Sequence, residues 1–325
     1  MRALVCKQYG PPSSLVLEDM ESPRPGPDEV LIDVAAAGVN FPDLLIIAGE
    51  YQVKTPPPFV PGAEVAGIAA AVGSNVDHVK VGDRIMGATP NGAFAEQRLM
   101  DARLVAHVPD GMSLQQAAGF LVTYGTSYHA LKQCTALQEG ETLLVLGAAG
   151  GVGIAAVEIG KAMGARVIAA ASSDDKLEFA RQFGADDVIN YSEQSLRDEI
   201  KRLTDGNGVD VVYDPVGGEL SQQALRGLAW HGRLLVVGFA SGDIPSFPAN
   251  LALLKEASIQ GVWWGTWSAK NPAEQIRNMQ ALGALFAAGK IKPQVTESYP
   301  LDRFEDAFAA IAERRAKGKV TLTMD

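Results

Sequence analysis

The stretch Leu143-Leu-Val-Leu-Gly-Ala-Ala-Gly-Gly-Val-Gly153 decides the fold of this 325-residue chain. A run of large apolar residues, typical of a buried strand, leads into closely spaced glycines, and the apolar segment Val152–Met163 that follows predicts a helix. A glycine-rich turn between a strand and a helix is the context in which proteins hold the pyrophosphate of a dinucleotide. The alternative is a plain turn of the same kind without a ligand.

The residues of this turn have different expected parts in binding. Gly150 lets the backbone approach a pyrophosphate, and Gly153 lets the helix pack closely on the strand. The amides of Gly151 and Val152 would face the phosphates at the start of the helix, where unpaired N–H groups favour anions. Ala148 stands where the first glycine of such turns usually sits, so the motif is a variant.

Strands and helices alternate downstream of the turn. Strands are predicted at 142–146, 165–171, 187–190, 209–213 and 233–237. Helices are predicted at 152–163, 174–183, 194–203, 218–228 and 273–288. Such an alternation indicates a parallel sheet with helices on both of its faces.

The two ends of the chain have a different texture. Residues up to about 120 are rich in short β-type runs separated by proline and glycine turns, and β-type runs return at 295–298 and 319–323, on either side of a helix predicted at 302–314. The simplest architecture inserts an α/β domain into a β-rich one. We therefore expect one domain at 1–122 plus 290–325 and a second at 123–289.

Composition limits the partners. Lys and Arg number 28 against 38 Asp and Glu, and the resulting net charge of −10 makes nucleic acid an unfavourable general partner. No apolar run reaches membrane-spanning length, and the first residues resemble a strand rather than a signal peptide, so we expect a cytoplasmic protein without a membrane partner. The two cysteines, Cys6 and Cys134, are expected to be reduced.

The end of the second predicted strand indicates which nucleotide is bound. NAD-binding turns place an acidic residue about 20 residues on, to hold the ribose hydroxyls. That position falls here at Ala171 or Ser172, and Ser173 and Lys176 follow, a set that suits the 2′-phosphate of NADPH. Lys176 has an alternative interpretation as an ordinary solvated helix residue.

Several segments outside the turn carry a family resemblance. They are 37–43 (AGVNFPD), 60–64 (VPGAE), 81–84 (VGDR), 92–96 (GAFAE), 123–128 (TYGTSY), 211–217 (VVYDPVG) and 318–320 (GKV). With the glycine turn, they resemble the medium-chain dehydrogenase/reductase superfamily, in its zinc-free quinone oxidoreductase branch, essentially from end to end. Trp263-Trp264-Gly265 is similar to a quinone oxidoreductase-like subgroup.

The resemblance implies a GroES-like β-rich domain with an inserted Rossmann domain, and an active site in the cleft between them. Zinc-dependent members place a Cys at the position of Asn40, a His at that of Ala63 and a third ligand near Val122. An amide, a methyl and an isopropyl group do not make a tetrahedral zinc site, so no metal is expected. The implied reaction is direct hydride transfer from NADPH to a quinone or another α,β-unsaturated carbonyl, which accepts hydride without a Lewis acid.

The resemblance also assigns residues to the site. Asn40 and Thr126 are implied near the nicotinamide, Tyr191 near the adenosine, and Ser172, Ser173 and Lys176 at the 2′-phosphate. Val216, Phe239, Ala240 and Lys319 are implied as further cofactor neighbours. Asn40 and Tyr51 are the candidate catalytic residues, and Leu45, Trp263 and Trp264 the candidate acceptor pocket. Leu45 replaces a tyrosine that some quinone reductases use, while the tryptophans have packing or a subunit interface as an alternative.

Other functions remain open from the sequence. An acryloyl- or enoyl-thioester reductase would use the same cofactor, and a catalytically idle NADPH-binding protein would keep the cofactor site alone. By analogy with the family, a homodimer is expected through an edge strand near Ser258–Val262.

Overall fold

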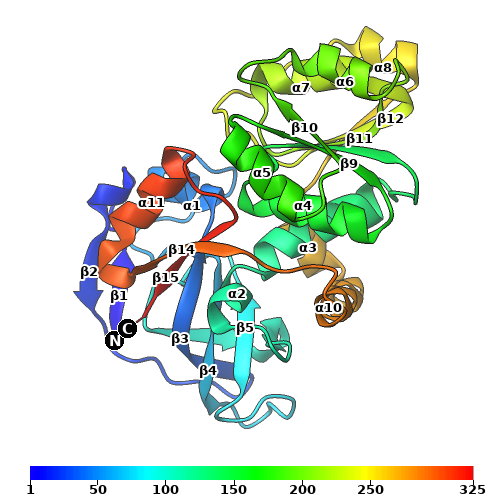
Figure 1. The fold of residues 1–325 in the computed structure, drawn as a ribbon. Helices are drawn as coiled ribbons and strands as arrows, with labels where there is room; N and C mark the ends of the chain where they lie inside the picture. Colours follow the sequence, from blue (N-terminus) through cyan, green and yellow to red (C-terminus); the bar gives the residue numbers. More distant parts are fainter. Residues whose placement is uncertain (325) are drawn as a thin grey trace. The chain divides into compact units, whose positions relative to one another are not determined.

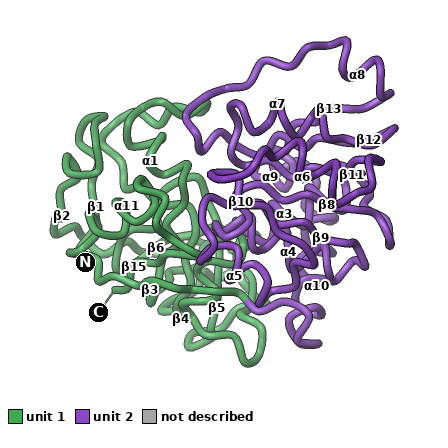
Figure 2. Tube along the Cα trace, turned by 45° about the horizontal axis from the view of Figure 1, so that its top comes forward, with its two compact units in different colours: residues 1–122, 293–325 green, residues 123–292 purple. Residues whose placement is uncertain are grey.

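The computed structural model describes residues 1–324, and the chain divides into two compact units (Figure 2). Unit 1 comprises Met1–Val122 together with the segment that begins at Pro293. Unit 2 comprises Thr123–Lys292. Each unit has its own sheet, and each is described by itself.

Unit 2 is built on a six-stranded sheet with the order β10-β9-β8-β11-β12-β13. Its strands are β8 (Thr142–Leu146), β9 (Arg166–Ala171), β10 (Asp187–Asn190), β11 (Val209–Asp214), β12 (Leu228–Val236) and β13 (Ser258–Gly261). Every pairing is parallel. From β8 the chain adds β9 and β10 on one side of the sheet, and it then adds β11, β12 and β13 on the other side. The boundary between β8 and β11, where the direction reverses, is therefore a topological switch point. The predicted doubly wound sheet is confirmed.

Helices cover both faces of this sheet (Figure 1). The helices of unit 2 are α4 (Gly151–Ala162), α5 (Asp174–Gln182), α6 (Leu196–Leu203), α7 (Gly218–Arg226), α8 (Ala249–Lys255), α9 (Trp264–Lys270) and α10 (Pro272–Ala287), and α3 (Leu121–His129) leads into the unit. Figure 1 shows α4 and α5 on one face and α6 and α7 on the other. Because both faces are covered, the inner strands are apolar almost without interruption, and Leu143–Leu146 are fully buried.

Unit 1 is built on a seven-stranded sheet with the order β14-β15-β3-β4-β5-β7, and β6 pairs with β3. Its strands are β3 (Glu29–Val39), β4 (Glu64–Val72), β5 (Arg84–Ala88), β6 (Gln97–Asp101), β7 (Val105–His107), β14 (Val295–Pro300) and β15 (Lys319–Thr323). A separate hairpin joins β1 (Arg2–Val5) to β2 (Val16–Asp19). β15, near the end of the described residues, pairs antiparallel with β3 in this sheet.

The helices of unit 1 are α1 (Phe41–Ala48), α2 (Leu114–Ala118) and α11 (Phe304–Ala312). Phe308 of α11 packs edge-to-face on Phe94, with 5.8 Å between the ring centroids, and this pair lies in the core between the helix and the strands. An N-cap explains why one helix begins later than predicted. The helix predicted from 194 begins at Leu196, because the Ser195 side chain accepts the N–H of Asp198 at its start.

No helix among residues 1–324 is long and apolar enough to cross a membrane. A π-helical turn at Ala130–Cys134, which the sequence did not indicate, follows α3.

Candidate functional site

The glycine turn of unit 2 joins β8 to α4 in the expected strand–turn–helix order. A Cβ added at Gly153 would lie 2.2 Å from the carbonyl oxygen of Gly147, so only glycine allows α4 to pack this closely. A Cβ added at Gly150 would meet only that same oxygen, at 3.4 Å, an ordinary distance. The two glycines therefore differ: Gly153 serves packing, while Gly150 keeps a partly exposed backbone open beside the first N–H groups of α4.

The end of β9 gathers hydroxyl groups and a lysine. Ser172 and Ser173 follow the strand, and Lys176 of α5 donates to the Ser172 hydroxyl at 3.3 Å. Because β10 pairs with β9, Tyr191 lies beside them, and its N–H donates to the carbonyl of Ala171 at 3.1 Å. A cation with two hydroxyls at the end of a strand is a set of groups that suits a phosphate.

Asp174, in the same region, is hydrogen-bonded to a residue of β10. Its carboxylate accepts the side-chain N–H of the buried Asn190 at 2.9 Å, at the first turn of α5. The acid thus ties β10 to α5 and also lies where the helix dipole favours a negative charge. These two roles explain why an acidic residue, Asp174, lies close to the predicted site of the 2′-phosphate.

Further predicted cofactor neighbours follow the ends of β11 and β12. Val216 lies beside the glycine turn, since a Cβ added at Gly147 would be 3.0 Å from its side chain. The buried Asp214 fixes this loop by accepting the N–H groups of Val216 and Gly217 at 2.8 and 2.9 Å, and burial raises the pKa of its carboxyl. Ala240, which follows Phe239, donates its N–H to Pro215 at 3.0 Å. The ends of the parallel strands share one edge of the sheet, so unit 2 brings these residues and the glycine turn together.

A buried acid on α4 was missed by the sequence reasoning. Glu158 is 3% exposed, accepts the hydroxyl of Tyr124 and accepts the N–H of Lys292 at 2.8 Å. Burial raises the pKa of its carboxyl to about 7. An acid in the otherwise apolar helical segment 152–160 was the available signal. On the neighbouring turn of α3, Ser127 binds both the carbonyl of Val152 and the Tyr213 hydroxyl at 2.9 Å, holding α3 against α4.

In unit 1, three polar side chains meet in the interior. The Lys319 ammonium donates to Asn40 Oδ1 at 2.5 Å and to Glu64 Oε1 at 2.6 Å, and Asn40 Nδ2 donates to Glu64 Oε1 at 3.1 Å. Glu64 Oε2 accepts the N–H of Val122 at 3.0 Å. Glu64 is fully buried and Lys319 is 5% exposed, so the charges neutralise each other away from water. We call Asn40, Glu64 and Lys319 the polar triad.

A second acid lies next to the polar triad. Asp43, fully buried on α1, accepts the backbone N–H of Asn40 at 2.8 Å through Oδ2, while its Oδ1 has no hydrogen-bond partner among residues 1–324. Burial raises the pKa of this carboxyl to about 7, and the nearby ammonium of Lys319 opposes the rise. Burial also raises the pKa of Tyr51, with a contribution from Asp43.

The candidate acceptor residues are spread over both units. Leu45 and Tyr51 lie together at the end of α1, where the N–H of Tyr51 donates to the Leu45 carbonyl at 3.1 Å. In unit 2, Trp264 donates its indole N–H to Gln275 at 3.1 Å and covers Gly125, where an added Cβ would lie 2.8 Å from the indole. These contacts favour packing for Trp264. Trp263, by contrast, is 52% exposed.

Trp263 borders a pocket of about 400 Å³ on unit 2. Trp267, His129 and Cys134 also line it. The His129 ring stacks on Trp267 at 4.1 Å and approaches the Cys134 sulfur at 3.4 Å. Burial lowers the pKa of His129 and raises that of Cys134, so both are neutral at physiological pH.

Thr126, expected near the nicotinamide, lies partly exposed on α3.

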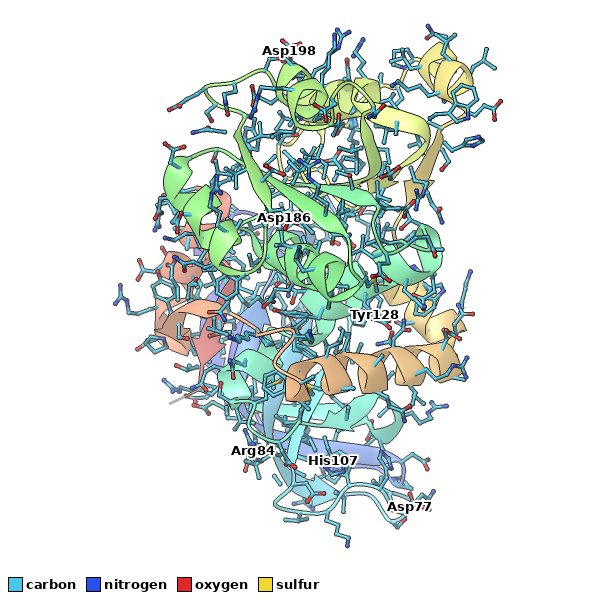
Figure 3. All side chains as sticks on the ribbon, turned by 45° about the vertical axis from the view of Figure 1, so that its right-hand side comes forward. Asp77, Arg84, His107, Tyr128, Asp186 and Asp198 are labelled. Atoms are coloured by element: carbon cyan, nitrogen blue, oxygen red, sulfur yellow. The ribbon has the colours of Figure 1, made fainter. Side chains whose placement is uncertain are left out.

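The remaining histidines lie outside the residues that the resemblance assigns to the site. His107, labelled in Figure 3, lies 2.9 Å from the carbonyl oxygen of His78 through Nε2. Across residues 1–324 there is no group of three or more His, Cys, Asp or Glu side chains that could hold a metal ion.

Both units match described protein families. Residues 26–110 match the alcohol dehydrogenase GroES-like domain, and residues 151–281 match the zinc-binding dehydrogenase family. The chain is 40% identical over 325 residues to quinone oxidoreductase-like protein 2 of Rattus norvegicus, covering 99% of this chain and 92% of that protein.

Solved structures are similar along the whole chain. Quinone oxidoreductase from Escherichia coli, solved in complex with NADPH, is 29% identical with a TM-score of 0.91, and the match covers 100% of both chains. The CurK enoyl reductase is 28% identical with a TM-score of 0.90, covering 100% of this chain and 99% of that chain.

The zinc named in one matched family can be tested against the residues present. The positions at which zinc-dependent members place ligands carry Asn40, Ala63 and Val122. Asn40 and the Val122 N–H both bind Glu64, and the Lys319 ammonium donates to Glu64 Oε1 and to Asn40 Oδ1. Glu64 offers one carboxylate, but an amide, a methyl group and a backbone N–H around an ammonium do not complete a zinc site, which needs three nitrogen, sulfur or carboxylate ligands and repels a cation.

Proposed function

Since the chain belongs to the medium-chain dehydrogenase/reductase superfamily, in its quinone oxidoreductase branch, we propose that it is an NADPH-dependent reductase of quinones or other α,β-unsaturated carbonyls. The observation that carries the proposal is the glycine turn between β8 and α4, with Ser172 and Ser173 after the adjoining strand β9 and Lys176 at the start of α5. NADPH supplies the hydride when it is bound. The structures of relatives with NADPH and of an enoyl reductase support the same reading.

The residues of this chain would bind and orient the two reactants. The N–H groups of Gly151 and Val152 would receive the pyrophosphate, and Lys176 with the serines would receive the 2′-phosphate. Tyr191, Val216, Phe239, Ala240 and Thr126 would line the nucleotide. An acceptor with extended conjugation spreads the incoming negative charge, so it needs donors and alignment rather than a Lewis acid. We therefore also propose that the reaction is independent of zinc.

A matched pair of glycine variants tests the cofactor site. Gly150→Ala has room for its methyl group in the fold but places it where the pyrophosphate would approach, so stability should hold while the Kd for NADPH rises. Gly153→Ala drives a methyl group against Gly147 and should destabilise the protein itself. Fluorescence titration with NADPH and thermal unfolding separate the two effects. Unchanged NADPH binding by Gly150→Ala would contradict the assignment of this turn.

The acceptor class is tested with two substrates. NADPH is mixed with 1,2-naphthoquinone or with crotonyl-CoA, and loss of the reduced nicotinamide absorbance is followed. Turnover of the quinone supports a quinone reductase, whereas turnover of crotonyl-CoA alone, itself an α,β-unsaturated carbonyl, would narrow the acceptor to thioesters, which the likeness to an enoyl reductase also allows. NADPH binding without turnover across a wide acceptor panel identifies an idle nucleotide-binding protein. Activity lost with EDTA and restored by zinc would overturn the metal-independent reaction.

Two residues of α1 and its following loop are proposed to face the acceptor. Tyr51 would donate a hydrogen bond to the oxygen on which negative charge develops, and Leu45 would make the pocket more apolar. Tyr51→Phe should lower turnover by about tenfold, the scale of one lost hydrogen bond to a developing charge, without a change in NADPH affinity. Parental rates in Tyr51→Phe with every acceptor would make Tyr51 a packing residue.

Assembly as a homodimer is proposed through β13. This strand is the edge of the unit 2 sheet, and all four of its residues are exposed. Its unpaired backbone groups would be satisfied by the same strand of a second copy. Light scattering should report twice the chain mass of 34.3 kDa, and a monomer at micromolar concentration would count against it.

A further inference from the structure

The polar triad forms where two long-range strand pairings converge. Gly38 of β3 is paired with Glu64 of β4 on one side and with Thr321 of β15 on the other. Lys319, at the start of β15, therefore reaches Glu64 across the end of β3. The meeting point depends on the register of three strands and not on one flexible loop.

Glycines leave room for this ion pair and little more. A Cβ added at Gly38 would lie 2.6 Å from Glu64 Oε1 and 2.8 Å from Lys319 Cε. A Cβ added at Gly119 would lie 2.5 Å from Lys319 Cγ. The ammonium, its aliphatic stem and the carboxylate thus occupy a close-fitting interior space that larger residues would fill.

The side chain of Asn40 is held at both ends inside this space. Its Oδ1 accepts from Lys319, and its Nδ2 donates to Glu64 at 3.1 Å and to the Gly38 carbonyl at 3.3 Å. A flipped amide would turn N–H groups toward the ammonium and oxygen toward the carboxylate, so the ion pair fixes one orientation. Asn40 is also the first residue before α1, and its backbone N–H donates to the Asp43 carboxylate of that helix at 2.8 Å.

We propose that Glu64 and Lys319 are positioning residues of the reductase: an internal carboxylate–ammonium pair that ties together the Asn40 and Val122 segments which zinc-dependent relatives tie together with a metal. This proposal rests on the proposed function. The pair holds the start of α1, and α1 leads to Leu45 and Tyr51, the proposed acceptor residues. Asn40 then acts through its fixed position rather than by offering a free donor to the acceptor.

A neutral double variant tests the proposal. In Glu64→Gln/Lys319→Met both charges are removed with little change in volume, and such replacements of a buried pair are commonly tolerated by the fold. We expect thermal stability close to the parent, but kcat with 1,2-naphthoquinone, measured at saturating NADPH, lower by about tenfold. The matched control is Arg303→Gln/Asp306→Asn, which removes an exposed ion pair of the same unit and should leave both quantities unchanged.

A second readout does not need turnover. The side-chain amide protons of Asn40, followed by NMR in the NADPH-free protein and assigned with an Asn40→Asp variant, should be protected from exchange in the parent and lose protection in the double variant. A folded double variant with parental kcat, or with an Asn40 amide that is still protected, would overturn the positioning role. Absence of any turnover in the parent would instead reject the proposed function, and the exchange measurement would still decide the role of the pair.

Discussion

Each unit buries a glutamate, and the two are accommodated in opposite ways. Glu64 of unit 1 meets the ammonium of Lys319 at 2.6 Å. Glu158 of unit 2 accepts the hydroxyl of Tyr124 and the N–H of Lys292, and burial raises the pKa of its carboxyl to about 7 although these hydrogen bonds and the charge of Lys292 oppose the rise. A buried acid can be balanced by a counter-charge or can hold its proton, and the two solutions respond differently to mutation and to pH.

The largest effect is expected from removing the counter-charge. Lys319→Met leaves the Glu64 carboxylate buried without a cation, and such a broken pair costs about 3–5 kcal/mol of unfolding free energy. Urea denaturation of the parent and the variant measures the loss. Adding Glu64→Gln should recover most of it, and a loss that persists in the double variant would show that the aliphatic stem of Lys319, rather than its charge, provides the stability.

A substitution of Lys176, in contrast, should change the affinity for NADPH rather than the stability of the fold. Lys176→Ala removes a cation from the end of β9, and a lost charge-assisted phosphate contact is worth about 1.5–3 kcal/mol, roughly tenfold to a hundredfold in Kd. Calorimetric titration should show weaker NADPH binding and nearly unchanged NADH binding. Equal affinities of the parent for both nucleotides would contradict a 2′-phosphate site at this position.

The pH dependence of stability should identify the acid that holds its proton. Because folding raises the pKa of Glu158 from 4.5 to about 7, its favourable contribution is complete below pH 4.5 and is lost as the pH rises through 7. Glu158→Gln cannot ionise, so its stability relative to the parent should increase across that window, by at most about 1.4 kcal/mol per pH unit. Thermal unfolding at several pH values measures this. The exposed Glu178→Gln on α5 is the control, and parallel pH curves for parent and Glu158→Gln would refute the assignment.

The smallest effect is expected from the neutral partner of Glu158. Tyr124→Phe removes one hydrogen bond but leaves no unpaired charge as long as the carboxyl is protonated, so the expected loss is about 1 kcal/mol. Chemical denaturation below pH 6 measures it. A loss as large as that of Lys319→Met would mean that the two buried acids are held in the same way after all.

The sequence predicted the features that depend on neighbours along the chain. The strand, glycine turn and helix around Gly150 lie within one continuous segment, and their periodicity and glycine spacing specify both the local structure and its place in a parallel sheet. The resemblance to the medium-chain dehydrogenase/reductase superfamily extended the prediction from local structure to the domain architecture. The roles of individual site residues stay predictions.

The contact between the three residues of the polar triad could not be predicted from the sequence in the same way. Asn40, Glu64 and Lys319 are far apart in the sequence and meet only through the pairing of β3 with β4 and β15. At the level of the sequence, Glu64 is one residue of the 60–64 segment that carries the family resemblance, and Lys319 is expected as a cofactor neighbour. An acid next to a vacated ligand position, with a lysine on a late β-type run, was a signal, but only strand register shows that they touch.

The position of β15 in the unit 1 sheet has a consequence for biosynthesis. This strand lies between β14 and β3, yet it is translated after the whole of unit 2. While the ribosome is still adding those residues, the stretch Ala36–Val39 of β3 lacks its β15 neighbour and Glu64 lacks its cation, whereas every strand of the unit 2 sheet has already emerged. The nascent chain can therefore complete unit 2 first, and the strands of unit 1 that are made before it must wait for β15, in reach of chaperones, before their own sheet can close.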